Sequence, residues 1–320
     1  MKAFVKDRYG SPDVLQLEEV DKPELSGPDA ILVQVRATGL NAHDWHMLRG
    51  KPYLARLTEG FRRPKERQLG LDVAGIAEEV GANVTDVRPG DAVYGSRWGA
   101  FAEYVSSRNM VPMPSGLTFE EAAAIPTAGM TALQGLRDRG ALEAGQHVLI
   151  NGAGGGVGTF AVQIAAALGG AVTAVTSTKN VEMVRSIGAT EVIDYTSDDF
   201  TRGSRRYDLI LDIGGNRRLS AMRRALTPTG RIVMVAPQPG QWIGPIARVA
   251  GAVITTRLGS RPAGAFLADV SRDDLLALKD LIEAGKLRPV IDRTYRFDQI
   301  PEGIRYVESG AAAGKVVISF

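Results

Sequence analysis

The sequence predicts an α/β protein that combines a doubly wound parallel sheet with a separate β-rich domain. Two observations carry this prediction. From residue 147 onward, short apolar strands alternate with helices, which is the pattern of a parallel sheet covered on both faces. Before about residue 115, the chain consists of short β-branched segments separated by Gly, Pro and Asp. The length of 320 residues also fits two domains better than one.

The N-terminal part contains four expected strands, joined by turn sequences such as "RPGD" at residues 88–91. Their short length and irregular spacing indicate a barrel or sandwich. The strands are expected at residues 30–40, 72–81, 91–95 and 100–107. Thr118 then forms a capping-box pattern with Glu121, three residues later, so a helix is expected to begin at this point.

The central part of the chain supplies the alternating elements. Strands are expected at residues 147–150, 171–176, 191–194, 208–213, 231–236 and 252–256. Helices are expected at residues 156–168, 181–187 and 272–286. Beyond them, isolated strands return in "VIDRTYRF" and "GKVVISF" around one short helix. We therefore expect one domain from residues 1–118, rejoined by 287–320, and a nucleotide-binding domain from residues 119–286.

The composition is that of an ordinary globular protein, with 44% apolar and 23% charged residues. A formal net charge of +2 gives no indication of nucleic-acid binding. The basic run "RRPKER" at residues 62–67 is interpreted as a solvated loop; the alternative is attraction of an anionic ligand to a nearby cleft. The absence of cysteine excludes disulfides, thiolate nucleophiles and cysteine-ligated zinc. With no secretory signal and no apolar stretch of membrane length, we expect a soluble cytoplasmic protein without a membrane partner.

The segment "NGAGGGVG", residues 151–158, lies between an apolar strand and an Ala-rich helix. A flexible linker would have polar, structureless neighbours, so a tight turn that lets a ligand approach the backbone is favoured. A strand, a glycine turn and a helix within about 30 residues are the dinucleotide-binding arrangement of a Rossmann fold. In that arrangement a diphosphate meets the helix N-terminus. Ala153 occupies the first position of the G-x-G-x-x-G pattern. The expected cofactor contacts are Gly152, Gly155, Gly156, Val157 and Gly158.

The end of the second expected parallel strand indicates which nucleotide binds. An NAD site has an acidic residue there to hold the ribose diol, but "TSTKN" at residues 176–180 has no carboxylate before Glu182. Ser177 and Lys179 instead suit a 2′-phosphate, because both side chains can donate hydrogen bonds to it. NADPH is therefore favoured over NADH; the alternative is that Lys179 is only an exposed residue at the next helix start. Further contacts are expected where parallel strands end, at Ile213, Gly214, Val235 and Ala236.

Four motifs together resemble a known family: "GAFAEYV", "AAAIPTAGMTAL", "AGQHVLINGAGGGVG" with Gln163, and "GKVVISF". They are similar, in the same order, to the medium-chain dehydrogenase/reductase superfamily, specifically its zinc-independent quinone oxidoreductase branch. The resemblance covers essentially the whole chain. It implies a GroES-like β-domain, a Rossmann domain inserted after it and a cofactor in the cleft between them. Two positions depart from the pattern: Ala166, where a basic residue or serine is usual, and Ala313, where an arginine often helps to hold the 2′-phosphate.

The positions that bind zinc in related alcohol dehydrogenases hold other residues here. Asn41 and Leu71 replace a cysteine and a histidine, and Ala123 falls near the position of the remaining cysteine. The four-cysteine structural lobe is missing as well. His43 and His46 are interpreted as polar packing or surface residues, since two histidines without a third ligand rarely form a metal site. We therefore expect no zinc.

Without zinc and without an evident catalytic base, reduction of an electrophilic acceptor suits the site better than oxidation of an alcohol. The enzyme would position the nicotinamide ring against a quinone or an α,β-unsaturated carbonyl and offer donors to the developing oxyanion. Solvent would supply the proton. The function that we expect is that of an NADPH-dependent quinone or enone oxidoreductase. The alternatives are a zinc-free alcohol dehydrogenase and a non-catalytic NADPH-binding sensor.

The resemblance also assigns individual roles. Asn41 is expected to donate its amide near the nicotinamide or the substrate oxygen, although it could be only a turn residue. Thr127 and Thr131 are expected to line the nicotinamide side, with helix capping as the alternative. Tyr53 could orient a quinone oxygen or simply cover the cleft, and Tyr195 is expected near the 2′-phosphate unless it is a core residue.

Asn41, Tyr53 and Thr131 are thus the expected catalytic residues. Trp45 and Trp98 are interpreted as packing residues, with a substrate platform as the alternative. The resemblance further suggests a homodimer, formed through the expected strand at residues 252–256.

Overall fold

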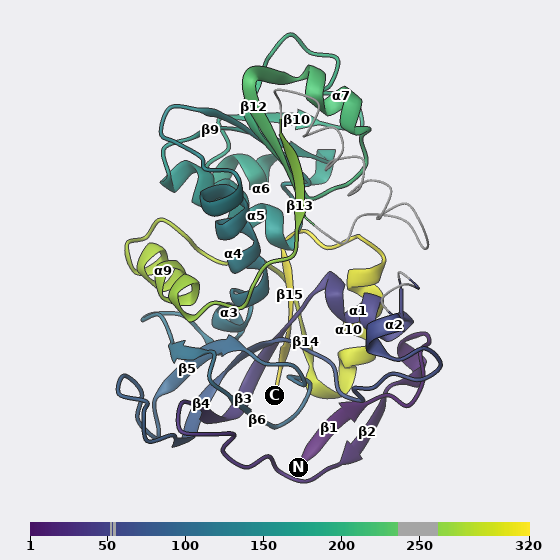
Figure 1. The fold of residues 1–320 in the computed structure, drawn as a ribbon, viewed down its shortest axis with the longest axis vertical. Helices are drawn as coiled ribbons and strands as arrows, with labels where there is room; N and C mark the ends of the chain where they lie inside the picture. The colour runs from purple at the N-terminus through teal and green to yellow at the C-terminus, as the bar shows by residue number, and fades with distance from the viewer. Residues whose placement is uncertain (52, 54–55, 236–261) are drawn as a thin grey trace. The chain divides into compact units, whose positions relative to one another are not determined.

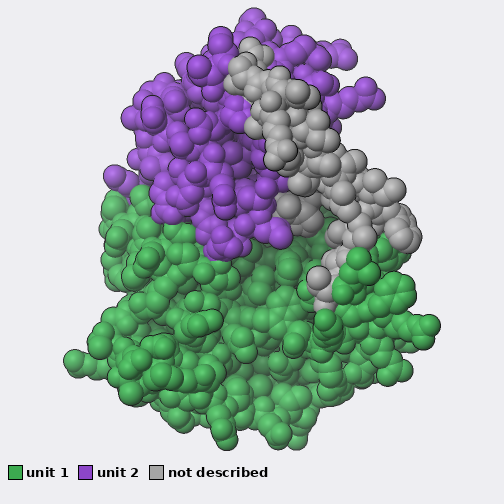
Figure 2. Space-filling model, viewed as in Figure 1, with its two compact units in different colours: residues 1–130, 270–284, 289–320 green, residues 131–269, 285–288 purple. Residues whose placement is uncertain are grey.

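The computed structural model describes residues 1–51, 53, 56–235 and 262–320 (Figure 1). The chain divides into two compact units, coloured separately in Figure 2. Unit 1 comprises Met1–Met130, Val270–Ala284 and Pro289–Phe320. Unit 2 comprises Thr131–Asp269 and Gly285–Arg288. The expected strand at residues 252–256 and the expected contact Ala236 lie outside the described residues.

Unit 1 is built on a mainly antiparallel seven-stranded sheet with the order β14-β15-β3-β4-β5-β7, in which β6 also pairs with β3. A separate hairpin-like pair joins β1 to β2. The strands are β1 (Lys2–Val5), β2 (Gln16–Glu19), β3 (Ile31–Leu40), β4 (Asp72–Val80), β5 (Ala92–Ser96), β6 (Tyr104–Ser107), β7 (Met110–Pro112), β14 (Ile291–Arg296) and β15 (Lys315–Ser319). The helices are α1 (Ala42–Arg49), α2 (Arg56–Glu59), α3 (Phe119–Ala123), α9 (Arg272–Glu283) and α10 (Ile300–Glu308), with short 3-10 turns η1 (Pro12–Val14) and η5 (Phe297–Gln299).

Two apolar clusters hold unit 1 together. One joins the inner faces of β3, β4, β5 and β6, and includes Val33, Val73 and Val93, which are fully buried. The other packs α1 and α10 against β15, with Leu48, Ile300 and Ile318 at its centre. The expected return of the C-terminal segment to the β-rich part is visible in the pairing of β15 with β3, where Val316 is opposite Leu40. The predicted capping box is confirmed, because Thr118 accepts from the Glu121 N–H at the start of α3.

Unit 2 contains a six-stranded sheet in which every pair is parallel, with the order β10-β9-β8-β11-β12-β13. This is the 3-2-1-4-5-6 order of a Rossmann sheet, so the predicted fold class is confirmed. The strands are β8 (His147–Asn151), β9 (Ala171–Thr176), β10 (Glu191–Asp194), β11 (Tyr207–Asp212), β12 (Leu226–Val235) and β13 (Ala263–Phe266). The helices are α5 (Gly156–Ala167), α6 (Val181–Ser186) and α7 (Leu219–Arg224), with a π-helical segment η3 (Gln134–Arg139) and a 3-10 turn η4 (Thr178–Asn180).

The helix α4 (Pro126–Leu133) runs across the division between the units. The limits of the two units differ from the expected domain limits at residues 119–130, 270–284 and 287–288, and both α3 and α9 belong to unit 1. The physical reason is their packing. The α3 helix packs on β3 and β4, and α9 lies against β7. The buried Tyr94 hydroxyl also donates to the Leu275 carbonyl oxygen on α9 at 2.5 Å.

Gln163 on α5 holds residues 285–288, a short segment of unit 2 that follows α9 in the chain. Gln163 Nε2 donates to the Arg288 carbonyl oxygen at 3.0 Å, and the Arg288 N–H donates back to Gln163 Oε1 at 2.9 Å. This reciprocal pair fixes residues 285–288 within unit 2. It gives Gln163, part of the motif that follows the glycine turn, a clear structural role.

Candidate active site

The turn between β8 and α5 is closed by backbone hydrogen bonds that leave little space. The N–H groups of Gly152 and Ala153 donate to the Val175 carbonyl oxygen at 3.1 and 3.0 Å. Gly152 has a φ of +94°, which favours glycine. A Cβ atom on Gly158 would stand 2.2 Å from the Gly152 carbonyl oxygen. Glycine is therefore required at both positions for the chain to pass from strand to helix.

The N-terminus of α5 is open in a way that suits an anion. Gly155 is the N-cap residue and supplies no side-chain cap, and the first turn holds no acidic residue. Among the described residues, a Cβ atom on Gly155 would meet nothing closer than 3.7 Å, so their packing does not require this glycine. The free N–H groups of the first turn and the positive end of a twelve-residue helix together fit a diphosphate. Gly155, Gly156 and Val157 are the residues at this opening.

The turn after β11 lies directly against the glycine turn. The N–H groups of Ile213 and Gly214 both donate to the Asn151 carbonyl oxygen at 3.0 Å. The buried Asn151 side chain donates to Asp212 Oδ1 at 2.7 Å, which ties the ends of β8 and β11 together. The structure thus brings Ile213 and Gly214 to the glycine turn. Val235 ends β12 in the same sheet.

The end of β9 carries Ser177 and Lys179, which begin and form η4. The Tyr195 N–H donates to the Thr176 carbonyl oxygen at 3.0 Å, so Tyr195 is adjacent to this strand end. Its side chain is 46% exposed, which rules out the alternative that it is a core residue. Ser177, Lys179 and Tyr195 therefore share one region of unit 2.

Asp194 is a residue of this region that sequence reasoning missed. It ends β10, and the parallel register places it opposite Thr176. Its carboxylate accepts from Thr178 Oγ1 at 2.5 Å and from the Thr196 N–H at 2.9 Å. These hydrogen bonds, that from Thr178 first, lower the pKa of Asp194. A carboxylate thus lies near a strand end that carries no acid in its own sequence.

A second group of polar side chains is buried in unit 1 around Asp72, the first residue of β4. Thr127 donates to Asp72 Oδ1 through its N–H at 2.9 Å and through its hydroxyl at 2.5 Å. Asn41 Nδ2 donates to Asp72 Oδ2 at 2.9 Å. Two of the predicted site residues, Asn41 and Thr127, are therefore joined through a carboxylate that the sequence analysis had placed only at the start of the expected strand at residues 72–81.

Lys315, the first residue of β15, completes this group. Its Nζ donates to Asn41 Oδ1 at 2.7 Å, to the Leu40 carbonyl oxygen at 3.1 Å and to Asp72 Oδ2 at 3.1 Å. The Lys315 and Asp72 side chains are 2% and 0% exposed. We refer to Asn41, Asp72, Thr127 and Lys315 as the Asp72 cluster.

The α1 helix, whose N-cap residue is Asn41, carries several titratable groups. The Asn41 N–H donates to Asp44 Oδ2 at 2.7 Å, while Asp44 Oδ1 has no hydrogen-bond partner among the described residues. Burial raises the pKa of Asp44 to about 7. Burial also lowers the pKa of His43, and lowers that of His46 to about 4. Asp44 therefore titrates near neutral pH, which its sequence position does not reveal.

The histidines and tryptophans of this region pack against one another. His46 stacks on Trp45 with 3.6 Å between ring centroids, and His43 meets Trp98 edge to face at 5.5 Å. Both tryptophans pack against the apolar cluster of α1 and α10. Within the described ranges, no group of three or more His, Cys, Asp or Glu side chains is arranged to hold a metal ion.

Tyr53 and Thr131 are the other two predicted catalytic residues. The Tyr53 ring lies 4.9 Å from the Arg56 guanidinium, which also lies 4.4 Å from the Tyr9 ring. Thr131 is buried on α4 in the part of that helix assigned to unit 2. Tyr53 belongs to unit 1, as Asn41 does, and Thr131 follows Thr127 by one turn of the same helix.

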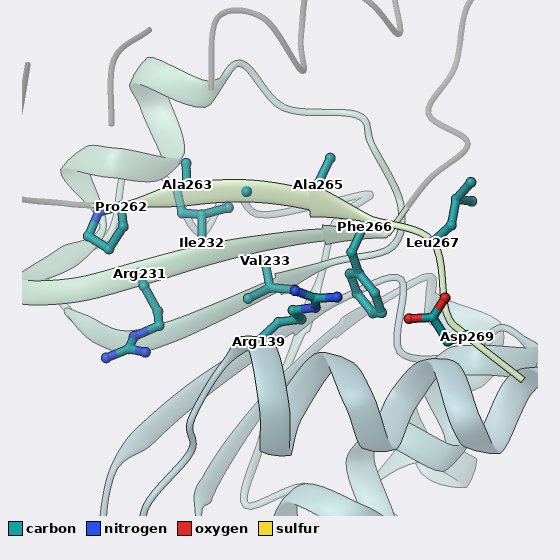
Figure 3. Close-up of a pocket in the computed structure, with 11 residues that line it drawn as sticks. Arg139, Arg231, Ile232, Val233, Pro262, Ala263, Ala265, Phe266, Leu267 and Asp269 are labelled. Carbon is teal, nitrogen blue, oxygen red and sulfur yellow. The ribbon is translucent and has the colours of Figure 1, made fainter. Parts of the chain in front are cut away.

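A pocket of about 530 Å³ lies along β12 and β13 in unit 2 (Figure 3). Arg139 lies 5.9 Å from the Phe266 ring at one side of it. None of the predicted site residues within the described part of the chain lines this pocket, so the pocket is not assigned to the reaction. In unit 1, Leu71 and Trp98 line a different pocket of about 560 Å³, and Leu71 directly precedes Asp72.

A Rossmann sheet with an open glycine turn, carried by a chain that also forms a β-rich unit, defines a nucleotide-dependent oxidoreductase. Comparisons with known proteins agree. Residues 27–115 match the family model for the alcohol dehydrogenase GroES-like domain, and residues 187–318 match that for zinc-binding dehydrogenase. None of the described helices is long and apolar enough to cross a membrane.

Three relatives illustrate the similarity. The chain is 32% identical to the bovine (Bos taurus) NAD(P)H oxidoreductase RTN4IP1, mitochondrial, covering 100% of this chain and 89% of that protein. It is 32% identical to the NADPH-dependent alkenal/one oxidoreductase, chloroplastic, of Arabidopsis thaliana, covering 99% and 79%. The structure of the quinone oxidoreductase from Coxiella burnetii matches with a TM-score of 0.86 and 30% identity, covering 100% and 99%.

The chain belongs to the medium-chain dehydrogenase/reductase superfamily, in its quinone oxidoreductase branch. It is an enzyme of the oxidoreductase class that uses a nicotinamide cofactor.

Proposed function

We propose that the protein transfers a hydride from NADPH to a quinone or an α,β-unsaturated carbonyl, without zinc. The observation that carries the proposal is the open N-terminus of α5 behind a turn that only glycine permits at Gly158. The similarity to the alkenal/one and quinone oxidoreductases supports the acceptor class. When bound, the nicotinamide supplies the hydride.

The proposed cofactor contacts follow the chain around the glycine turn. Gly155, Gly156 and Val157 would meet the diphosphate through their backbone, while Gly152 and Gly158 allow the approach. Ile213, Gly214, Val235 and Ala236 would contact the cofactor where parallel strands end. Ala236 is proposed from the sequence alone.

The preference for NADPH rests on the end of β9. Ser177, Lys179 and Tyr195 would contact the 2′-phosphate there, and Lys179 would supply the positive charge. Two residues disfavour NADPH. They are the carboxylate Asp194 in the same region, and Ala313, which stands where some relatives have an arginine. The two dinucleotides must therefore be compared directly.

The proposed catalytic residues are Asn41, Tyr53 and Thr131, with Thr127 on the nicotinamide side. Asn41 Nδ2 is held by Asp72, and its second hydrogen bond, to the Gly39 carbonyl oxygen, is long at 3.4 Å. That N–H is the one that would turn to a developing oxyanion. Leu71 and Trp98 would line the space for the acceptor.

The test is an activity assay with three dinucleotides and three substrate classes. Purified protein is assayed with NADPH or NADH against a panel of quinones and enones, and with NADP⁺ against alcohols, with and without a zinc chelator. We expect NADPH oxidation with quinones or enones that chelation leaves unchanged. Absence of any NADPH fluorescence change at micromolar protein contradicts the proposal. Alcohol oxidation alone would indicate a zinc-free alcohol dehydrogenase, and binding without turnover a sensor.

We further propose that the protein is a cytoplasmic homodimer. This proposal is supported by the sequence and by its family resemblance. The name of the bovine relative gives a mitochondrial location for that protein. Light scattering after size exclusion gives the subunit number. A mass of about 34 kDa, equal to one chain of 34.2 kDa, would exclude the dimer.

A further inference from the structure

Asp72 receives hydrogen bonds on both carboxylate oxygens from inside unit 1. Oδ1 accepts the Thr127 N–H and hydroxyl, and Oδ2 accepts Asn41 Nδ2 and Lys315 Nζ. The side chain is fully buried and forms an ion pair with Lys315. A salt-bridged carboxylate surrounded by donors acts only as an acceptor. Asp72 therefore determines which N–H and O–H groups of its neighbours are already engaged as hydrogen-bond donors.

The consequence for Thr127 follows from its having a single hydroxyl proton. The hydroxyl uses that proton in its hydrogen bond to Asp72 Oδ1, which is 2.5 Å long. The hydroxyl oxygen can then meet a ligand only through its lone pairs. Thr127 is an acceptor, not a donor, in this arrangement.

The consequence for Asn41 is the reverse. Lys315 Nζ lies 2.7 Å from Asn41 Oδ1, so the amide oxygen must face the ammonium and the amide nitrogen must face Asp72. Among the residues that the structure describes, the remaining N–H has only the long bond to the Gly39 carbonyl oxygen. Asn41 can therefore meet a ligand only as a donor.

We propose that Asp72 is a positioning residue that sets these opposite polarities, so that Thr127 accepts from the carboxamide NH₂ of the nicotinamide while Asn41 donates to an oxygen. The proposal rests on the proposed function for the presence of the nicotinamide. The carboxamide is the part of that ring that carries N–H donors, so it matches the lone pairs of Thr127. An amide at position 72 would itself donate, and the polarity of Thr127 would no longer be fixed.

The test compares NADP⁺ with its 3-acetylpyridine analogue, in which a methyl group replaces the carboxamide NH₂. Dissociation constants are measured by titration calorimetry for the unaltered protein and for Thr127→Val, which removes the hydroxyl but keeps the backbone N–H that binds Asp72. Asp72→Asn is the second variant. Asp86→Asn, which changes an exposed residue paired with Arg272, is the control.

We expect the unaltered protein and the control to bind NADP⁺ about tenfold more tightly than the analogue. Thr127→Val and Asp72→Asn should reduce this ratio to less than about twofold. A merely structural role would weaken both dinucleotides equally and leave the ratio unchanged, which would overturn the proposal. If the unaltered protein binds neither dinucleotide, the proposed function fails, and the carboxamide assignment fails with it. Should Asp72→Asn not fold, Thr127→Val alone decides.

Discussion

Lys315 Nζ lies 3.1 Å from Asp72 Oδ2, and both side chains are withdrawn from solvent. Removing one member of such a pair leaves a buried charge uncompensated, which typically costs about 3–5 kcal/mol. We therefore expect Lys315→Met to lower the free energy of unfolding by roughly 3 kcal/mol, measured by urea denaturation. The double variant Lys315→Met/Asp72→Asn should recover part of the loss, because it removes both charges. Additive losses in the double variant would mean that the two charges are not coupled.

The two glycines at the start of α5 should respond differently to the same added methyl group. Gly158→Ala would place a Cβ atom 2.2 Å from the Gly152 carbonyl oxygen, so we expect a loss of about 1–3 kcal/mol of stability and loss of nucleotide binding. Gly155→Ala has space within the protein, with its nearest contact at 3.7 Å. It should keep its melting temperature but weaken NADPH binding about tenfold or more, because the methyl group stands where the diphosphate approaches. Normal NADPH affinity in Gly155→Ala would argue against this site.

Asp44 should make the protein less stable as the pH rises from about 4 to about 7. Its pKa is about 7 in the folded protein and 3.8 in the unfolded chain, so the folded state holds the extra proton in this window. Stability from this group is fully present below about pH 4 and is lost toward pH 7. Asp44→Asn cannot titrate and still accepts from the Asn41 N–H. Relative to the unaltered protein, this variant should gain roughly 2–3 kcal/mol between pH 5 and pH 8, measured by denaturation at each pH.

Lys179 should distinguish the two dinucleotides. Loss of its charge in Lys179→Gln removes an attraction to a 2′-phosphate that NADH lacks, so we expect the affinity for NADPH to fall by ~10-fold and that for NADH to stay within about twofold. Rising salt should reduce the difference between variant and unaltered protein. Lys22→Gln, at a surface ion pair with Glu78 in unit 1, is the control. An equal loss for both dinucleotides would indicate that Lys179 serves the fold rather than the phosphate.

The sequence predicted the parallel sheet well, because strands buried on both faces are apolar throughout and their helices alternate with them. Its errors fall where that signal is weak. The β13 strand, "AGAF", is short and rich in Gly and Ala, and β12 begins at Leu226, five residues before the expected start. The glycine turn was identified because all its residues are adjacent in the chain.

The Asp72 cluster could not be assembled from the sequence. Its hydrogen bonds join residues 31, 55 and 243 positions apart, and no local pattern reports such distances. Asn41 and Thr127 came from the family resemblance. Asp72 had appeared only as the first residue of an expected strand, and Lys315 only inside the motif "GKVVISF". Asp194 was missed for a similar reason, because the register of two parallel strands brings it beside Thr176.

The pairing of β15 with β3 has a consequence for the order in which unit 1 can fold. One edge of β3 is shared, with residues 31–34 paired to β6 and residues 37–40 paired to β15. The second pairing waits for a segment synthesised some 275 residues after Leu40. During translation the Rossmann unit can complete its sheet first, while half of the β3 edge stays open to solvent and to chaperones. The hydrogen bond from Lys315 to Asp72 therefore forms together with the pairing of β15 with β3, and the Asp72 cluster depends on that pairing.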